Sequence, residues 1–179
     1  MSKKVLIISS SPREGGNSDT LCDRFLLGAQ EAGHTVEKVF LNKCKINYCT
    51  GCGACYDSHS CIIKDDMESL LQKMINADVI VLATPIYFYT MAAQLKTFID
   101  RCVSRYAEIT NKEFYFIVTA ADTEEENLQT AIESLRGFTR DCLEGALEKG
   151  IIYGTGVWQV GEVQRKPAYQ EAYEMGKNC

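Results

Sequence analysis

The sequence predicts an α/β fold, with a doubly wound five-stranded parallel sheet and helices on both faces. Three observations support this prediction. Short apolar runs alternate five times with longer segments of helical periodicity. The run 79–83 is apolar throughout, as in a strand that is covered on both faces. The 179 residues contain no internal repeat, low-complexity tract or linker, so we expect a single domain over 1–179.

The predicted strands are short runs of β-branched and aromatic residues that end in polar loops. The run Val5-Leu6-Ile7-Ile8 begins the first of them. Because a helix separates each strand from the next, we expect parallel pairing with right-handed crossovers. In chain order, the strands are expected at 5–9, 36–41, 79–83, 114–119 and 151–153, and the last can extend to Trp158.

The predicted helices carry apolar residues three or four positions apart, which places those residues on one face. In the first helix these are Leu21, Phe25, Ala29 and Ala32, and Gly33 ends it as a left-handed cap. The helices are expected at about 18–32, 65–75, 95–102, 125–148 and 168–177, with Leu147 among the core residues of the fourth, and loops are expected at 42–64 and 84–91.

The loop between the first strand and the first helix, 9–20, is rich in groups that bind anions. It holds four serines, a threonine, an asparagine and an arginine. Gly15 and Gly16 leave backbone N–H groups accessible, and the helix N-terminus presents the positive end of its dipole. A simpler alternative is a turn in which Ser18 or Asp19 caps the helix. Because ligands of such sheets bind at the carboxyl ends of the strands, we favour a phosphate site.

The loops after the third and fourth strands, 84–91 and 119–123, should meet the phosphate loop at the same edge of the sheet. The first of them holds Pro85 and three consecutive aromatic residues at 87–89. These aromatics either form a small core cluster or offer ring faces to a flat ligand. Since consecutive aromatics cannot all point inward, at least one should be exposed. A ligand with a phosphate at one end and a flat body at the other, such as flavin mononucleotide (FMN), fits these loops.

Composition excludes several classes of function. The net charge of −5 and the pI of about 5.1 argue against nucleic acid and anionic membranes as partners. No apolar run reaches membrane-span length and no signal peptide precedes the first strand, so we expect a cytoplasmic protein. The sequence holds neither a G-x-G-x-x-G motif after a strand nor a G-x-x-x-x-G-K-[ST] loop, so the usual dinucleotide and nucleotide fingerprints are absent.

Nine cysteines in a cytoplasmic chain indicate thiol, metal or redox chemistry rather than a disulfide framework. Four of them have the spacing C-x2-C-x2-C-x5-C, and a turn through Gly51 and Gly53 can gather the first three. These four are Cys49, Cys52, Cys55 and Cys61. The close spacing favours a four-thiolate iron–sulfur cluster, with a disulfide or free thiols and a zinc site as alternatives. We expect Cys102 and Cys142 to be core residues of their helices.

Three motifs occur together in this chain. They are Ser-Pro-Arg-x-x-Gly-Asn-Ser at 11–18, the cysteine motif that continues through 61–67, and Thr84-Pro85-Ile86-Tyr87 followed by the segment 93–101. Together they resemble the NADPH-dependent FMN reductase family, and most closely its iron–sulfur flavoprotein branch. The likeness covers about 4–122 well and the C-terminal third loosely. One departure is Ser10, where the family often has glycine.

The resemblance implies a flavodoxin-like fold, with strand order 2-1-3-4-5, that binds FMN without a covalent bond. By that likeness the FMN phosphate is held by Ser11, Arg13, Asn17 and Ser18, with Ser9 nearby. The isoalloxazine ring is lined by Pro85, Ile86, Tyr87 and Phe88, and its other edge by Thr119, Ala120 and Asp122. Family members are usually dimers or tetramers with the flavin near a subunit interface, so a homodimer or homotetramer is expected.

The expected function is FMN-dependent electron transfer. NAD(P)H or a reduced carrier would reduce FMN, which would reduce a quinone, a flavin or another acceptor, and a [4Fe-4S] cluster on the four cysteines could take part. Because the flavin performs the electron chemistry, no side chain is assigned as catalytic. Two alternatives stay open: an iron–sulfur flavoprotein that carries electrons between partners, and a non-enzymatic, cysteine-based sensor of redox state or metal.

Overall fold

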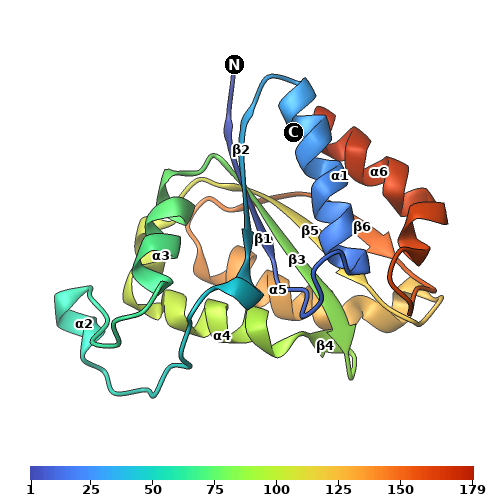
Figure 1. Ribbon diagram of the computed structural model, residues 1–179. Coiled ribbons are helices and arrows are strands. Elements are labelled where there is room, and N and C mark those ends of the chain that lie inside the picture. The colour runs from blue at the N-terminus through green and yellow to red at the C-terminus, as the bar shows by residue number, and fades with distance from the viewer.

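The computed structural model describes all of residues 1–179 and shows one sheet with helices on both faces (Figure 1). Its parallel strands follow the order β2-β1-β3-β5-β6, and the short β4 pairs antiparallel with β3. Without β4 this is the predicted 2-1-3-4-5 order, so the predicted fold class is confirmed. The strands are β1 (Lys4–Ser9), β2 (Thr35–Phe40), β3 (Val79–Tyr87), β4 (Thr90–Met91), β5 (Glu113–Thr119) and β6 (Leu147–Gly154).

The helices form a layer on each side of the sheet: α1 and α6 cover one face, and α3, α4 and α5 cover the other (Figure 1). They are α1 (Asn17–Glu31), α2 (Cys55–Ser58), α3 (Met67–Asn76), α4 (Ala93–Arg101), α5 (Gln129–Cys142) and α6 (Pro167–Lys177). None of them combines the length and apolar composition that crossing a bilayer requires.

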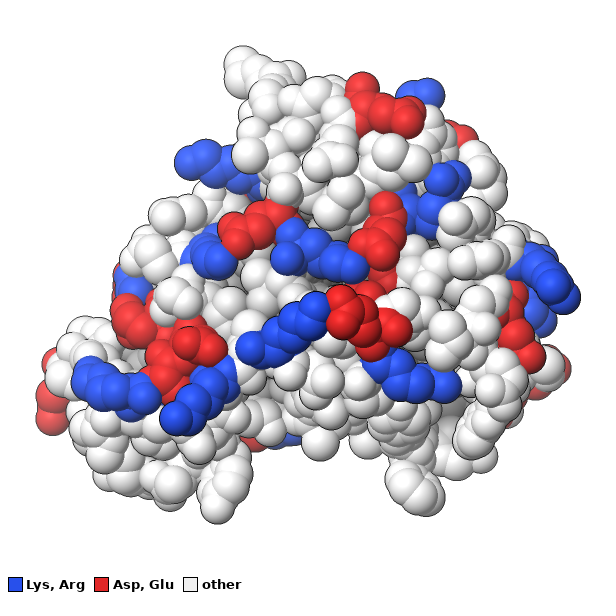
Figure 2. Space-filling view, viewed as in Figure 1, with Lys and Arg blue, Asp and Glu red and all other residues white.

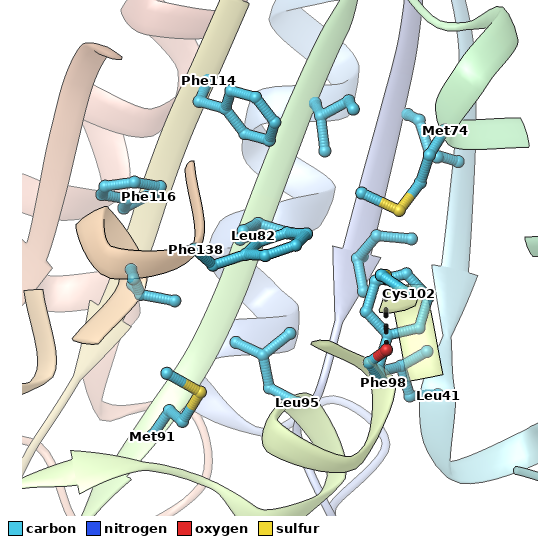
Figure 3. Close-up of a cluster of buried hydrophobic side chains, with 14 of the residues drawn as sticks. Leu41, Met74, Leu82, Met91, Leu95, Phe98, Cys102, Phe114, Phe116 and Phe138 are labelled. Atoms are coloured by element: carbon cyan, nitrogen blue, oxygen red, sulfur yellow. Dashed lines mark hydrogen bonds between the residues drawn. The ribbon is translucent and has the colours of Figure 1, made fainter. Parts of the chain in front are cut away.

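Alternate residues of each central strand enter two different apolar cores. Leu82 of β3 and Phe116 of β5 pack with α3, α4 and α5, as Figure 3 shows. Their neighbours Val81 and Ile117 pack with α1 and α6 on the other face. A strand covered on both faces must be apolar at every position, which is why 79–83 shows no alternation in the sequence.

The predicted helix 125–148 is too long at both ends. It begins as a 3₁₀ turn, and α5 itself ends at Cys142. Leu143 is extended and Gly145 has a φ of 68°, so the chain turns and enters β6 at Leu147. Leu147 pairs with Glu113 and is exposed, because the start of this edge strand lies open to solvent. Leu147 therefore has the spacing of a helical core residue only by coincidence, since it belongs to the next strand.

The predicted core role is confirmed for Cys102 and wrong for Cys142. Cys102 is buried, and its thiol donates to the carbonyl oxygen of Phe98 at 3.4 Å, as the dashed line in Figure 3 marks. Cys142 is exposed at the end of α5. Cys142 has the helical spacing of a core residue, but it lies in the last turn of α5, which extends past the edge of the core.

The predicted loop 84–91 is a β-hairpin. β3 continues to Tyr87, which pairs with Thr90 of β4. The two residues at the tip, Phe88 and Tyr89, have φ values of 50° and 63°. Such left-handed turns usually contain glycine or asparagine, so no ordinary turn residue marks this hairpin in the sequence.

Helices α1 and α6 meet without intervening side chains. A Cβ atom at Gly28 of α1 would overlap the carbonyl oxygen of Tyr173, and one at Gly176 of α6 would overlap that of Phe25. The two glycines therefore allow backbone to lie against backbone. This contact fixes α6 to the helix that begins at the predicted phosphate loop.

Candidate functional site

The predicted phosphate loop, between β1 and α1, is folded around the carboxylate of Asp19. The hydroxyl of Ser9 donates to Oδ1 of Asp19 at 2.7 Å, and the N–H of Gly15 donates to Oδ2 at 3.0 Å. Asp19 is buried, and its charge is offset by Lys38 of β2, whose Nζ lies 3.1 Å from Oδ1. These bonds hold the end of β1 and the middle of the loop together.

The first turn of α1 contains a buried hydroxyl without a partner. The helix begins at Asn17, directly after Gly16, and no side chain caps it, so neither Ser18 nor Asp19 plays the capping role of the simpler alternative. Ser18 is 1% exposed, and its Oγ makes no hydrogen bond. The first N–H groups of a helix also lack intrahelical acceptors. The Ser18 hydroxyl and the positive dipole end therefore lie together here, and the nearest carboxylate, Asp19, is already paired with Ser9, Gly15 and Lys38.

The serines that precede this turn are paired within the fold. Both the N–H and the hydroxyl of Ser10 donate to the carbonyl oxygen of Ala83 in β3, at 3.0 and 2.7 Å. The hydroxyl of Ser11 donates to the carbonyl oxygen of Arg13 at 2.7 Å. Ser10 does not have a positive φ, so this position does not need glycine. Its hydroxyl instead ties the loop to the neighbouring strand.

A cavity of about 310 Å³ opens at the carboxyl ends of the central strands. All three predicted segments contribute to its wall, which confirms that the fold brings them together. Seven of the twelve predicted cofactor residues line it: Arg13, Asn17, Pro85, Ile86, Tyr87, Thr119 and Ala120. Cavities of this size and mostly apolar lining are typical of small-molecule sites.

The segment after β6 completes the cavity. Its sequence predicted only that the last strand could extend to Trp158, but β6 ends at Gly154. Val157 and Trp158 line the wall. The guanidinium of Arg13 donates to the carbonyl oxygen of Trp158 at 3.2 Å, and the amide of Asn17 donates to that of Gln159 at 2.9 Å. The N–H of Val163 donates back to Oδ1 of Asn17 at 3.3 Å. The signal that could have revealed this segment is the single tryptophan directly after the last strand.

The three consecutive aromatic residues are all exposed, as at least one was expected to be. Tyr87 lines the cavity and is 45% exposed. Phe88, at the tip of the hairpin, is 99% exposed and does not line it, and Tyr89 is 61% exposed. The hairpin therefore presents one aromatic side chain to the cavity and two to the surroundings.

Asp122 lies just outside the cavity wall. Its carboxylate accepts hydrogen bonds from the N–H of Glu124 at 3.0 Å and from the amide of Asn127 at 2.9 Å. Its backbone carbonyl accepts the N–H of Gly156 at 2.7 Å. The residue thus fixes the turn after β5 and joins it to the segment that carries Trp158.

The cysteine loop places all four predicted ligands around one small cavity of about 50 Å³. Gly51 and Gly53 have φ values of 65° and 75°, as expected for the turn between the first three cysteines. All nine cysteines are free thiols, and no three side chains converge closely enough to hold a metal ion in this structure. Burial raises the pKa of the Cys22 and Cys102 thiols, so both remain protonated in the core.

A buried ion pair lies beneath the cysteine loop. Arg101, at the end of α4, is paired with Asp65 at 2.7 Å, and their side chains are 1% and 0% exposed. Burial alone would raise the pKa of Asp65, but hydrogen bonds from Arg101 and from the N–H groups of Asn47 and Met67 hold it well below its usual range. Both residues belong to the sequence motifs. Asp65 was expected at the start of the next helix, where it anchors the far end of the cysteine loop, and Arg101 was given no role.

A wider cleft of about 1030 Å³ lies between the cysteine loop and the hairpin. Cys49 lines one side of it, Met91 of β4 another, and Ile99 and Phe138 its apolar floor. In Figure 2, charged side chains of both signs alternate across the middle of the face, whereas the lower margin, where the loop and the hairpin project, is mostly uncharged.

Two comparisons by sequence show which proteins the chain is similar to. A profile of the NADPH-dependent FMN reductase family matches residues 3–139. An iron–sulfur flavoprotein of Archaeoglobus fulgidus is 43% identical over 98 residues, which are 55% of this chain and 44% of that protein. One of Methanosarcina thermophila is 40% identical over 100 residues, 56% of this chain and 52% of its own length. The matches therefore span about half the length of these curated relatives.

Solved structures share the fold over nearly the whole chain. An NAD(P)H:quinone oxidoreductase from Methanothermobacter marburgensis has a TM-score of 0.78 at 20% identity, covering 99% of this chain and 97% of that one. An FMN-dependent NADH-azoreductase from Bacillus anthracis, in complex with FMN, has a TM-score of 0.74 at 18% identity and covers 99% of each chain. Identities this low show the fold alone. With the family profile matching most of its length and the motifs meeting at one cavity, the chain belongs to the NADPH-dependent FMN reductase family.

Proposed function

We propose that residues 1–179 form one domain that binds FMN and passes electrons from NAD(P)H through it to a quinone, a flavin or another acceptor. The observation that carries this proposal is the buried, unpartnered hydroxyl of Ser18 at the positive end of α1, next in sequence to Asn17, which lines a cavity of about 310 Å³. A buried donor without a partner costs free energy, which an anion at this position recovers. The family to which the chain belongs supports FMN as that ligand.

The donor set fits the phosphate of FMN. In our proposal, the hydroxyl of Ser18 and the first N–H groups of α1 bind the phosphate oxygens, and Arg13 supplies a positive charge at the cavity wall. Ser11 and Asn17 shape the loop through the bonds described above. Ser9 has an indirect role, because its hydroxyl donates to Asp19 and holds that carboxylate in place.

The remaining wall fits the flat ring. Pro85, Ile86 and Tyr87 form one side, and Thr119 and Ala120 form part of the other. Apolar and aromatic walls of this kind exclude water and orient a ring by contact. Phe88 and Asp122 take indirect parts in this proposal: Phe88 projects toward a second copy of the chain in a homodimer or homotetramer, and Asp122 holds the turn after β5.

The bound flavin supplies the hydride and electron chemistry. The chain's own residues bind the phosphate, orient the ring and shield it from water. Arg13 and Tyr87 are the titratable residues among those that line the cavity, so no carboxylate or imidazole is placed there as a general acid or base. This arrangement suits a reaction in which the electron donor and the electron acceptor bind at the flavin one after the other.

Titration of the flavin-free protein with FMN, followed by turnover assays, tests the proposal. We expect saturable binding of one FMN per chain and FMN-dependent oxidation of NADH or NADPH with a quinone as acceptor. Absence of saturable FMN binding to folded protein would refute the proposed function. Binding without NAD(P)H oxidation would instead favour a carrier that is reduced by another protein.

A second candidate function, an iron–sulfur flavoprotein that carries electrons, is favoured by the cysteine loop. Four thiols line one cavity beside the buried guanidinium of Arg101, whose Nε has no partner. This donor set fits a four-thiolate cluster, which would supply one-electron chemistry when bound. Closure of the loop around the metal is required, because no three thiols converge as the loop stands.

Iron and sulfide analysis after anaerobic reconstitution tests this second candidate. We expect about four irons per chain, lost in Cys52→Ala. Cys142→Ala is the matched control, because Cys142 is an exposed cysteine outside the loop. Iron absent from the parent would leave a plain FMN reductase, and absence of both iron and FMN would favour the non-enzymatic sensor.

A further inference from the structure

We propose that Arg101 is a positioning residue that clamps both ends of the cysteine loop and donates its free Nε–H to the sulfur of Cys61. The clamp follows from the structure alone, whereas the donation to a ligated sulfur rests on the proposed cluster site. Arg101 lies at the end of α4, outside the loop, so it can hold the loop to the body of the fold.

One guanidinium bonds to the chain on both sides of the four cysteines. Its Nη1 donates to the carbonyl oxygen of Asn47 at 2.6 Å, two residues before Cys49. Its Nη2 donates to the carbonyl oxygen of Ile63 at 3.4 Å, two residues after Cys61. The ends of the cysteine loop are therefore joined through a single side chain.

Asp65 completes the clamp. Its two carboxylate oxygens accept from Nη1 and Nη2 of Arg101 at 2.7 and 3.0 Å, the two-pronged geometry that suits a guanidinium. Oδ2 also accepts the N–H of Asn47 at 2.9 Å, and Oδ1 accepts that of Met67 at 3.2 Å. The carboxylate thus joins the start of the loop to the start of α3 and balances the buried charge.

A second link joins the ends of the loop, because the N–H of Lys45 donates to Oδ2 of Asp66 at 2.7 Å and the N–H of Asp66 donates to the carbonyl oxygen of Lys45 at 3.1 Å. Few other contacts hold the loop. Its large side chains are exposed: Tyr48 is 76% exposed, Tyr56 71% and Ile62 61%. Its only helix, α2, has four residues, none of them buried. Segments with so little buried apolar surface open readily. The loop's order therefore depends on the clamp more than on packing.

The remaining donor of Arg101 lies at the cysteines. Nε is buried and has no hydrogen-bond partner, and Arg101 and Cys61 line the same cavity. A hydrogen bond to a ligating sulfur stabilises the more negative, reduced state of a cluster. Nε–H is placed to make that bond.

Thiol alkylation of the metal-free, full-length chain, read by mass spectrometry, tests the clamp. Arg101→Lys keeps the charge but cannot bind Asp65 and two carbonyls in a fork. We expect the two half-buried loop cysteines, Cys55 and Cys61, to react with iodoacetamide at least about tenfold faster, the factor that about 1.4 kcal/mol of lost local order produces. Arg105→Lys is the matched control, because Arg105 pairs with Glu68 and Glu108 and not with the loop.

Loaded protein provides a second measurement. We expect Arg101→Lys to hold less iron after reconstitution, and its remaining cluster to have a more negative reduction potential than that of Arg105→Lys. Equal alkylation rates in the parent, Arg101→Lys and Arg105→Lys would overturn the clamp. Faster alkylation with an unchanged potential would overturn the Nε donation alone.

The design separates failure of this inference from failure of the proposed cluster. If the parent binds no iron, the cluster proposal fails, and the alkylation rates still decide the clamp. If Arg101→Lys unfolds, the double variant Asp65→Leu/Arg101→Met replaces the ion pair with apolar side chains, a change that folds usually tolerate. It lacks the N–H groups that donate to the carbonyl oxygens of Asn47 and Ile63, so rapid alkylation is expected in it as well. Protection at the parent rate would overturn the clamp.

Discussion

Replacement of Ser18 by alanine should separate flavin affinity from the stability of the flavin-free protein. The hydroxyl of Ser18 is buried and makes no hydrogen bond, so its removal takes no bond from the folded chain. Burial of an unpaired hydroxyl is unfavourable, so the variant should be as stable as the parent or slightly more so. A phosphate at the start of α1, by contrast, would lose a charge-assisted donor.

The expected size of the loss follows from the charge of the phosphate. Hydrogen bonds to charged groups contribute about 1.5–3 kcal/mol, which corresponds to an increase in Kd of about 10- to 150-fold. Asn17→Ala should behave differently. It breaks the bonds to Gln159 and Val163 and so should lower both the FMN affinity and the free energy of unfolding.

Two assays check these expectations: fluorescence titration with FMN, and urea unfolding of the flavin-free proteins. Ser69→Ala is a matched control, because Ser69 lies in the first turn of α3 and its hydroxyl donates to Asp66 far from the cavity. An FMN affinity of Ser18→Ala equal to that of the parent would refute the assignment of the phosphate to the start of α1. A marked loss of stability in Ser18→Ala would show that the hydroxyl has a partner in the flavin-free protein.

Three further predictions follow from other parts of the fold. Trp158 is the only tryptophan and lines the cavity, so FMN should quench the intrinsic fluorescence; unchanged emission at saturating FMN would place the flavin elsewhere. The double variant Phe88→Asn/Tyr89→Gly should raise the free energy of unfolding by about 1 kcal/mol in urea titrations, because both positions have positive φ; no gain would mean that the turn is not strained. Because folding lowers the pKa of Asp65, its contribution is present above the unfolded value of about 3.9 and is lost as the pH falls. The free energy of unfolding should therefore fall less between pH 7 and pH 3 in Asp65→Asn than in the parent. Equal falls in the two proteins would contradict the depressed pKa.

The fold could be predicted from the sequence because its signals are local and repeated. Val79 to Ala83 is apolar throughout because both faces of the sheet are covered, and Leu21 and Phe25 share the face of α1 that packs on it. The position of the predicted binding loops could be predicted in turn, because the loops at the carboxyl ends of parallel strands meet at one edge of the sheet. Errors occurred where local patterns are ambiguous, as at Leu147, whose helical spacing conceals the start of an edge strand.

The rest of the site depends on contacts between distant segments. Nothing near Trp158 in the sequence shows that its carbonyl accepts the guanidinium of Arg13. The pairing of Arg101 with Asp65 likewise joins two motifs that were recognised separately. The hairpin at Phe88 escaped prediction for another reason, since an aromatic residue stands where turn chemistry favours asparagine or glycine.

The backbone contact between α1 and α6 has a consequence for the order of folding. The cavity joins segments far apart in the chain: Arg13 and Trp158 are separated by 145 residues, and Asn17 and Val163 by 146. Contacts of such long range form late, because the entropy of closing the intervening chain must be overcome first. A nascent chain that ends before Val157 therefore has the phosphate loop but not the opposite wall, and α6, which packs on α1, follows that wall in the chain. Flavin capture is then a final event of folding, and FMN added during refolding should accelerate only the last phase.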